Sequence, residues 1–249
     1  MKKERIDKLL VEKGLAESSV NARALVMSGV VLADETRVEK PSQEFYTNVS
    51  IRIKGKSQTT KFVGRGGLKL EKALRDFHIQ PNEYICLDIG SSTGGFTDCL
   101  LQNGAKKVYA VDAGTNQIVW KLRCDERVEV RENVNARYLK PQDFAVRFDL
   151  IVIDVSFISV TKIFPVLPSL LKENGKIITL VKPQFEVEKG EVGARGVVRE
   201  QAKHERVVAQ VNKAAETIGL NVLGVIESPI LGANGNREFL ALYENRNKN

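Results

Sequence analysis

Cysteine and histidine are scarce in this sequence of 249 residues, which contains three cysteines and two histidines. The cysteines are odd in number and far apart, and no Cys-x-x-Cys pair occurs, so neither a disulfide framework nor a zinc site is expected. The histidines have no Cys or His partner nearby in the sequence. We therefore expect no metal, and we expect all five to be packed or surface residues: Cys86, Cys99, Cys124, His78 and His204.

Long hydrophobic stretches are also missing. The longest stretches without a charged side chain are ten residues, at 24–33 and 217–226, whereas a membrane-spanning helix needs about 20 apolar residues. The basic N-terminus leads into no apolar core of the signal-peptide type. With 43% hydrophobic and 28% charged residues, the composition is that of a folded soluble protein, and we expect it in the cytoplasm.

Positive charge is concentrated at the start of the chain. Residues 1–76 hold 16 Lys and Arg against 10 Asp and Glu, and residues 77–249 hold 22 against 21, which gives net charges of +6 and +1. A basic segment joined to a nearly neutral one predicts a polyanion-binding module beside a catalytic or structural domain. A solvated lysine-rich surface is the alternative. The length permits one large domain with a small companion, at ~100–200 residues per domain.

The first sixty residues predict a small α+β domain of two helices followed by short strands. Helical spacing over residues 6–13 ends at Gly14, and Ser18 or Ser19 can cap a second helix. Apolar stretches between residues 30 and 53 have the length of short strands. The domain is therefore expected to span residues 1–60.

The motif residues of this first domain are Arg5-Ile6-Asp7-Lys8-Leu9-Leu10, Gly14-Leu15-Ala16, Ala24 and Gly29-Val30-Val31. Together they resemble the alpha-L RNA-binding domain first known from ribosomal small-subunit protein four. In that family the two helices present basic residues to structured RNA. The family usually has Ser-Arg at the start of the second helix, whereas the arginine is displaced here. The resemblance implies RNA contacts by Arg5, Lys8, Lys13 and Arg23.

Residues 54–61 follow; they are polar, basic and without periodicity, which is typical of a domain junction. We expect it to end in an interdomain linker at residues 61–67, where three glycines permit close approach of the backbone to another surface. Lys61 and Arg65 of this linker are expected to contact RNA. A helix is predicted over residues 68–77, with Lys69 outside its apolar stripe and beside the glycine turn.

From residue 84 the sequence alternates between apolar strands and helices. This alternation predicts a parallel sheet with helices on both faces, and the expected fold is a Rossmann-like α/β domain over residues 68–245. Ligands of such sheets bind at the carboxyl ends of the strands. The predicted strands are 84–87, 107–111, 150–153 and 176–181, the predicted helices are 96–103, 117–123, 163–171 and 201–218, and 222–227 and 239–243 form a terminal strand pair.

A glycine-rich turn follows the first of these strands. The sequence contains neither G-x-G-x-x-G nor G-x-x-x-x-G-K-[ST], which disfavours a dinucleotide and a phosphate-gripping loop. Asp112 ends the next strand, twenty-two residues after the first glycine of the turn, where a carboxylate can accept both hydroxyls of a ribose. The combination resembles the S-adenosylmethionine site of Rossmann-like methyltransferases, with Asp88 facing the methionine amino group and Asn135 near the adenine. The turn residues expected at this cofactor are Gly90, Ser91, Ser92, Gly94, Gly95 and Phe96.

Three more charged residues flank the expected ends of strands, namely Asp154, Lys182 and Glu238. A lysine at such a position is not needed for packing, and burying its charge is costly without a role. Methylation of an exocyclic base nitrogen is disfavoured because Val155-Ser156 stands where two prolines usually follow the acid. The chemistry of 5-methylcytosine needs a cysteine nucleophile, and none lies in this region. An oxygen acceptor is therefore favoured.

The order Lys69, Asp154, Lys182 and Glu238 is similar to the catalytic tetrad of the FtsJ-like ribose 2′-O-methyltransferases. With the alpha-L domain in front, the chain resembles the TlyA family from about Arg5 to Tyr243. The resemblance implies an enzyme that uses S-adenosylmethionine to methylate a ribose 2′-hydroxyl, expected at cytidine, in ribosomal RNA or ribosomal subunits. A monomer is expected. The motifs specific to this family are 65–70, 88–98, 154–159 and 181–186.

Two other functions are compatible with parts of the sequence. Members of the TlyA family are often also labelled haemolysins, but pore formation needs spanning or strongly amphipathic surfaces, and the sequence shows neither. The second alternative is an RNA-binding protein with a degenerate methyltransferase fold, against which the complete set of four charged residues argues. Lysis by the purified protein and methyl transfer to bulk ribosomal RNA distinguish these functions.

Overall fold

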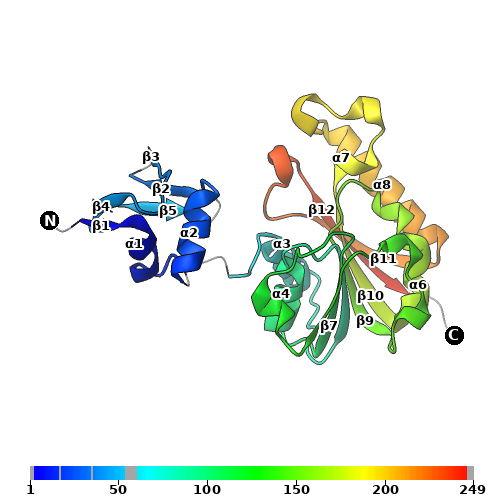
Figure 1. The fold of residues 1–249 in the computed structure, drawn as a ribbon. Coiled ribbons are helices and arrows are strands. Elements are labelled where there is room, and N and C mark those ends of the chain that lie inside the picture. The colour runs from blue at the N-terminus through cyan, green and yellow to red at the C-terminus, as the bar shows by residue number, and fades with distance from the viewer. Residues whose placement is uncertain (1–2, 17, 35, 54–60, 246–249) are drawn as a thin grey trace. The chain divides into compact units, whose positions relative to one another are not determined.

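The computed structural model describes residues 3–16, 18–34, 36–53 and 61–245, and the chain forms two compact units, Met1–Thr60 and Lys61–Asn249 (Figure 1). The smaller unit contains helices α1 (Ile6–Glu12) and α2 (Ser19–Met27). Helix α2 begins at the predicted place because the Ser18 side chain accepts a hydrogen bond from the backbone N–H of Asn21 at 3.2 Å. Apolar residues of both helices pack on the strands in a small core of their own.

The strands of the smaller unit are two or three residues long. Strand β1 (Lys3–Arg5) pairs with β4 (Glu44–Tyr46), and β2 (Val31–Ala33) pairs with both β3 (Thr36–Arg37) and β5 (Ile51–Ile53), all antiparallel. The predicted order of two helices followed by short strands is confirmed, except that β1 precedes the helices. Its sequence, Lys-Glu-Arg, carries no apolar alternation that could have predicted a strand.

The larger unit is built on a seven-stranded sheet in the order β11-β12-β10-β9-β6-β7-β8. Strands β8, β7, β6, β9 and β10 are parallel, whereas β12 is antiparallel to both β10 and β11. The strands are β6 (Ile85–Ile89), β7 (Lys107–Val111), β8 (Val128–Arg131), β9 (Phe148–Ile153), β10 (Leu171–Val181), β11 (Leu220–Glu227) and β12 (Phe239–Asn245).

Helices cover both faces of this sheet, which confirms the predicted α/β fold (Figure 1). Successive strand residues point to opposite faces, so Leu87 and Ile151 belong to one core and Cys86 and Leu150 to the other. The first core is closed by α6 (Leu167–Leu170) and α8 (Gln201–Thr217), and the second by α3 (Gly66–Asp76), α4 (Gly95–Gln102) and α5 (Trp120–Arg123).

Two predicted helices are shorter than expected. The stretch 117–123 is helical only at α5, and 163–171 is divided into a 3₁₀ turn, η4 (Phe164–Val166), and the four-residue α6. Pro165 and Pro168 lack the backbone N–H that a continuous helix needs, and each stands at the start of a short piece. The other short elements are α7 (Pro183–Glu186), η1 (Ala136–Tyr138), η2 (Pro141–Asp143), η3 (Val160–Lys162), η5 (Lys189–Glu191), η6 (Ala194–Gly196) and η7 (Ala233–Gly235).

Residues 61–67, which the sequence suggests are a linker, pack within the larger unit. Phe62 is buried against α3, and the backbone N–H of Val63 donates to the Asp98 carboxylate of α4 at 2.8 Å. Side-chain burial and this hydrogen bond fix the segment in front of α3, where Lys69 lies. The rest of the expected domain junction, residues 54–60, lies outside the described residues.

Candidate active site at the carboxyl ends of the strands

The carboxyl ends of β6, β7, β9 and β10 border two adjoining cavities. The larger cavity has a volume of about 490 Å³ and lies over the ends of β6 and β7 and the loop after β9. The smaller cavity, of about 180 Å³, lies over the glycine-rich turn after β6 and the residue that follows β10. Four residues line both cavities and therefore mark the place where they meet: Gly90, Ser92, Asp154 and Ser156.

Asp112 stands at the end of β7 on the wall of the larger cavity. Its two carboxylate oxygens accept hydrogen bonds from the backbone N–H groups of Ser92 at 2.8 Å and Gly114 at 2.7 Å. Each carboxylate oxygen has two lone pairs, so both retain accepting capacity. Asn135 lines the same cavity, and its side-chain oxygen accepts from the backbone and side chain of Arg137, both at 3.2 Å.

The turn after β6 needs glycine at two positions. Gly90 has φ +84° and Gly94 has φ +99°, a region that other residues rarely adopt. A Cβ at Gly90 would also overlap the backbone oxygen of Asp154, and one at Gly94 would overlap the side chain of Leu122. Gly90 and Ser92 line both cavities, whereas Ser91, Gly95 and Phe96 line the smaller one and Gly94 lines neither.

Asp88 lies at the end of β6 but is fully buried and lines neither cavity. One of its oxygens accepts from the Thr97 hydroxyl at 2.6 Å, and the other has no partner among the described residues. Burial raises the pKa of Asp88 to about 7, and the bond from Thr97 opposes that shift. Asp88 is therefore a buried acid at the end of β6, and its contact with the methionine amino group stays a prediction.

Asp154 and Lys182 come together where the two cavities meet. Lys182 Nζ lies 2.6 Å from Asp154 Oδ1 and donates a hydrogen bond to Ser156 Oγ at 2.8 Å. Lys182 directly follows β10 and precedes Pro183, the first residue of α7. Its side chain is largely buried and lines the smaller cavity, so the amine is held at a fixed place on the wall.

Lys69 and Glu238 form a second, more deeply buried ion pair. Lys69 lies in the first turn of α3, Glu238 directly precedes β12, and their charged atoms are 2.5 Å apart. Both side chains are at least nine-tenths buried, and neither lines either cavity. The four predicted residues are thus brought to the crevice side of the sheet as two cation–anion pairs, of which only Asp154–Lys182 borders the cavities.

The loop after β9 is fixed against α7. Phe157 is 92% exposed, has φ +65°, and its ring contacts Phe185 in a tilted arrangement with 5.2 Å between centroids. Glu186 accepts from the hydroxyl of Ser159 at 2.6 Å and from the backbone N–H of Val160 at 2.8 Å, and burial raises the pKa of this carboxyl. An exposed aromatic side chain with φ above zero is uncommon, and this one stands at the mouth of the larger cavity.

The predicted RNA-contacting residues differ in their surroundings. In the smaller unit, the guanidinium groups of Arg5 and Arg23 both contact the buried carboxylate of Asp7, at 2.8 and 3.3 Å. The Arg5 and Arg23 side chains lower the pKa of Asp7, with hydrogen bonding by Arg5 as the largest cause. The remaining four residues lie on the surface of their units: Lys8, which is 3.5 Å from Glu4, Lys13, Lys61, which pairs with Glu71, and Arg65.

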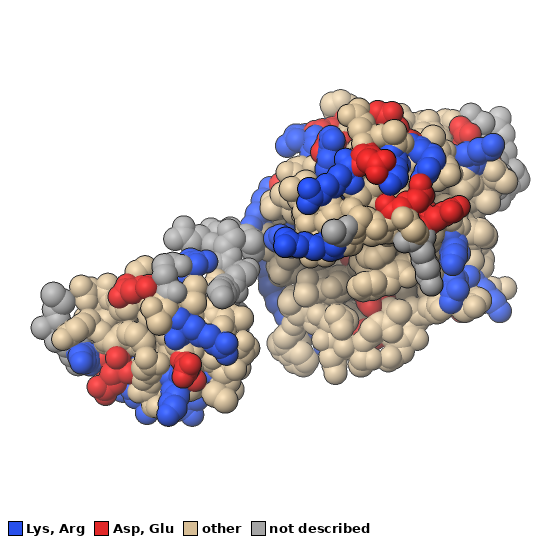
Figure 2. Space-filling model, turned by 90° about the horizontal axis from the view of Figure 1, so that it is seen from above, with Lys and Arg blue, Asp and Glu red and all other residues tan. Residues whose placement is uncertain are grey.

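Three polar residues of these sites were not found from the sequence. Asp7 and Thr97 lie inside quoted motifs, and Ser156 was noted only as a replacement for proline. Each would have been signalled by its position one to three residues from a predicted site residue, but its partner could not be known without the fold. Figure 2 shows the larger unit from the crevice side, with acidic side chains in a hollow among uncharged ones.

An amine held beside a carboxylate at the edge of a cavity can receive or polarise a proton from a hydroxyl. The neighbouring larger cavity, with a fixed carboxylate and a glycine-rich turn, can hold a ribose-containing ligand beside that amine. The described residues contain no group of three or more His, Cys, Asp or Glu side chains that could hold a metal ion.

Family models match nearly the whole chain. A model described as FtsJ-like methyltransferase matches residues 62–244, and one described as S4 domain matches residues 4–45. The protein YqxC of Bacillus subtilis (strain 168), named as a candidate rRNA methyltransferase, is 48% identical over 240 residues, which are 96% of this chain and 85% of that protein.

Two further proteins are similar over most of their length. The 16S/23S rRNA (cytidine-2′-O)-methyltransferase TlyA of Mycobacterium tuberculosis is 41% identical over 235 residues, which are 94% of this chain and 87% of that protein. The solved structure of a candidate hemolysin from Streptococcus thermophilus is 46% identical with a TM-score of 0.75, and the match covers 100% of this chain and 90% of that one.

Proposed function

Because the chain belongs to the family of FtsJ-like methyltransferases and carries an S4 domain before that part, we propose that it methylates the 2′-hydroxyl of a cytidine in ribosomal RNA. The methyl donor in this proposal is S-adenosylmethionine. The observation that carries the proposal is the Lys182 amine, which lies 2.6 Å from Asp154 and borders the smaller cavity next to the larger one. We propose that it acts on this RNA in the cytoplasm and as a monomer.

The larger cavity supports the choice of cofactor. Asp112 is held by two backbone N–H groups and keeps lone pairs for two ribose hydroxyls. Gly90 lets the backbone approach a ligand closely, and Ser92 and Asn135 line the same cavity. When bound, the cofactor supplies an activated methyl group on a positively charged sulfur.

The two ion pairs have different roles in the proposed methyl transfer. A ribose 2′-hydroxyl is a weak nucleophile, so it gains from a base that receives its proton. We assign that role to the neutral amine of Lys182, with Asp154 directing it and Lys69–Glu238 supporting the same wall from α3 and β12. Positioning supplies much of the rate when the methyl donor is already activated.

The S4 domain supports RNA as the substrate class. Arg5 and Arg23 are ordered by one buried carboxylate, so both guanidinium groups are presented from the same surface of the smaller unit. A guanidinium group can donate two parallel N–H hydrogen bonds to two oxygens of one phosphate. The exposed Phe157 ring beside Ser156 offers a stacking surface for a base next to the smaller cavity.

Membrane lysis is the rival that the name of the Streptococcus thermophilus structure suggests. Among the described residues, no helix is both long enough and apolar enough to cross a membrane. Purified wild-type protein should therefore methylate RNA and leave erythrocytes intact. Lysis that persists in a Lys182→Ala variant would support the rival.

The decisive experiment is methyl transfer from labelled cofactor to ribosomal subunits that lack the modification. We expect label in the wild type, and a loss of about 10²–10⁴-fold or more in Lys182→Ala. Lys182→Arg should not restore activity, because arginine stays protonated and cannot accept the proton. An RNA with a 2′-deoxy sugar at the mapped nucleotide should take up no methyl, and label at a base in that RNA would contradict 2′-O chemistry.

A further inference from the structure

Ser156 lies where the two cavities meet. It lines both of them, and its Oγ accepts a hydrogen bond from Lys182 Nζ at 2.8 Å. Because the hydroxyl is the acceptor in this contact, its own hydrogen points elsewhere. Within the part of the chain that the structure describes, that hydrogen reaches no acceptor.

The Lys182 amine is held from two sides. Asp154 Oδ1 lies 2.6 Å from Nζ and Ser156 Oγ lies 2.8 Å from it. A neutral amine has two hydrogens and one lone pair in a tetrahedral arrangement. One hydrogen is donated to Ser156, whereas Asp154 Oδ1 lies within ion-pair distance and accepts no hydrogen bond among the described residues, so Ser156 alone sets the direction of an N–H bond. With that N–H bond fixed, the lone pair can be directed at the smaller cavity, which Lys182 lines.

The two partners contribute differently. Asp154 is charged and would by itself favour the protonated amine, whereas the neutral hydroxyl of Ser156 contributes mainly direction. Without the hydrogen bond to Ser156, Nζ could rotate about the last bond of the lysine side chain, and its lone pair would point in several directions. The neutral acceptor therefore fixes the direction of the amine without adding a charge.

The loop that carries Ser156 is anchored on both sides. Asp154 ends its strand side, with its backbone N–H bonded to the Ile89 carbonyl at 3.0 Å. On the other side, Glu186 accepts from Ser159 and Val160. Ser156 itself is exposed to the cavities, so its hydroxyl is a fixed group on an open wall.

We propose that Ser156 is a positioning residue that directs the lone pair of Lys182 toward the ribose 2′-oxygen. This inference rests on the proposed function. In the step concerned, the O–H bond of the 2′-hydroxyl breaks and the proton forms an N–H bond at Lys182 Nζ, while an oxygen electron pair forms the bond to the methyl carbon. The bond from that carbon to the sulfonium sulfur of S-adenosylmethionine breaks at the same time, and its electron pair stays on sulfur, so the leaving group is the neutral thioether S-adenosylhomocysteine. A misplacement of about 1 Å in such a step costs about 10²-fold in rate.

The test compares Ser156→Ala and Ser156→Thr in the full-length protein. We expect kcat on ribosomal RNA to fall about 10- to 100-fold in Ser156→Ala, because a misdirected base costs up to about 10²-fold in rate. The Kd for S-adenosylmethionine and the KM for RNA should stay within about twofold. Ser156→Thr keeps the hydroxyl and should recover most of kcat, because the open wall has room for a methyl group. Ser169→Ala removes an exposed hydroxyl at α6 and is the matched control.

Two results would overturn the role of Ser156. One is a Ser156→Ala variant with wild-type kcat, and the other is a Ser156→Thr variant as slow as Ser156→Ala, which would mean that side-chain shape and not the hydroxyl matters. A crystal structure of Ser156→Ala gives a separate readout, in which we expect Lys182 Nζ to leave its present direction. If the wild type transfers no methyl to RNA, the proposed function fails. The crystal structure of Ser156→Ala then still tests the role of Ser156: a displaced Lys182 Nζ supports it, and an unmoved Nζ contradicts it.

Discussion

Asp88 is a buried acid whose environment makes the stability of the larger unit depend on pH. Burial raises its pKa to about 7 from an ordinary value near 3.8, with the Thr97 hydroxyl opposing and Asp154 adding to the shift. The folded state therefore binds a proton more tightly than the unfolded state between about pH 4 and pH 7. The contribution of Asp88 to the free energy of unfolding is fully favourable below pH 4, falls as pH rises, and levels off above 7.

We predict that Asp88→Asn removes this dependence. Asparagine keeps an oxygen for the Thr97 hydroxyl and does not ionise. The difference in unfolding free energy between variant and wild type should grow in favour of the variant from pH 4 to 7, by no more than about 1.4 kcal/mol per pH unit. Urea unfolding at several pH values measures it. A constant difference across this range would show that Asp88 does not titrate there.

At this scale, the sequence could predict where a side chain sits along the chain but not what it meets. Asp112 and Lys182 were expected at strand ends because apolar runs stop just before them, and the strands β7 and β10 do end there. The contact of Lys69 with Glu238 joins residues 169 positions apart. Only the packing of α3 beside the start of β12 determines that contact, and likewise the burial of Asp88 beneath its turn.

A glycine in the loop between β11 and β12, Gly232, leaves room for the side chain of Glu238. Gly232 has an ordinary φ of −74°, so no backbone strain requires glycine there. A Cβ at this position would, however, overlap the carboxylate of Glu238. The backbone N–H of Gly232 donates to the Asn236 carbonyl at 2.8 Å, which holds the loop close to Glu238.

We predict that Gly232→Ala displaces the Glu238 carboxylate from Lys69 and lowers turnover at least tenfold. The obstructed atoms are the far end of a flexible side chain, so the fold should persist, and cofactor affinity should be unchanged because Glu238 lines neither cavity. Methyl-transfer rates, calorimetry and thermal unfolding measure these three quantities. Gly190→Ala, where a Cβ meets nothing within 4 Å, is the matched control and should behave as wild type.

Whole elements were predictable where their apolar residues are periodic and buried. Strands β7 and β10 and helix α8 have long buried faces, and their existence followed from the pattern. Strand β8 (Val128–Arg131) is half buried and alternates apolar with charged residues, a pattern typical of a strand, but it covers only four residues and was not predicted. Short pieces such as α5 and α7 depend on the turns around them, which periodicity does not describe.

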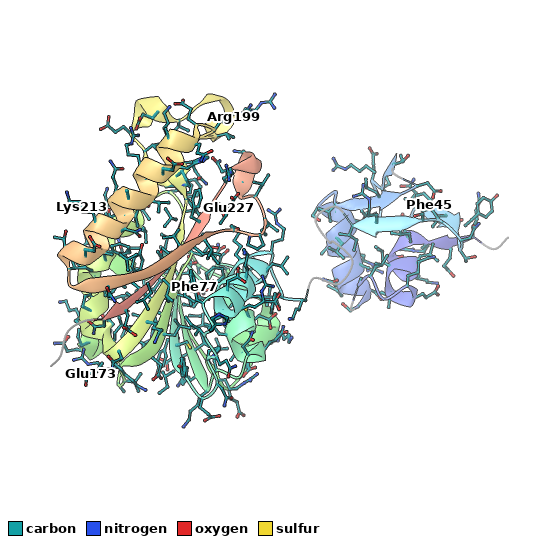
Figure 3. All side chains as sticks on the ribbon, turned by 180° about the vertical axis from the view of Figure 1, so that it is seen from behind. Phe45, Phe77, Glu173, Arg199, Lys213 and Glu227 are labelled. Atoms are coloured by element: carbon teal, nitrogen blue, oxygen red, sulfur yellow. The ribbon has the colours of Figure 1, made fainter. Side chains whose placement is uncertain are left out.

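The whole molecule consists of two compact units with separate cores, and its excess positive charge lies in the first third of the sequence. The outer side of α8 in the larger unit carries exposed charges as well, among them Lys213 (Figure 3). Family membership was predictable because motifs 88–98 and 181–186 are long enough to be specific. The arrangement of charges around Asp7 was not, since it needs α1 and α2 side by side.

If the smaller unit supplies much of the RNA contact, removing residues 1–60 should lower RNA affinity and flatten its salt dependence together, because fewer phosphates are neutralised. Cofactor affinity should not change, since the larger unit keeps both cavities.

In the full chain, Arg23→Gln leaves Arg5 on Asp7 and should reduce the slope of log affinity against log salt by about 0.9 if one duplex phosphate contact is lost. Lys213→Gln makes the same charge change on the outer side of α8 and should leave the slope unchanged. Equal slopes for Arg23→Gln and Lys213→Gln would mean that the contact is diffuse attraction and that the guanidinium ordered by Asp7 has no particular phosphate partner.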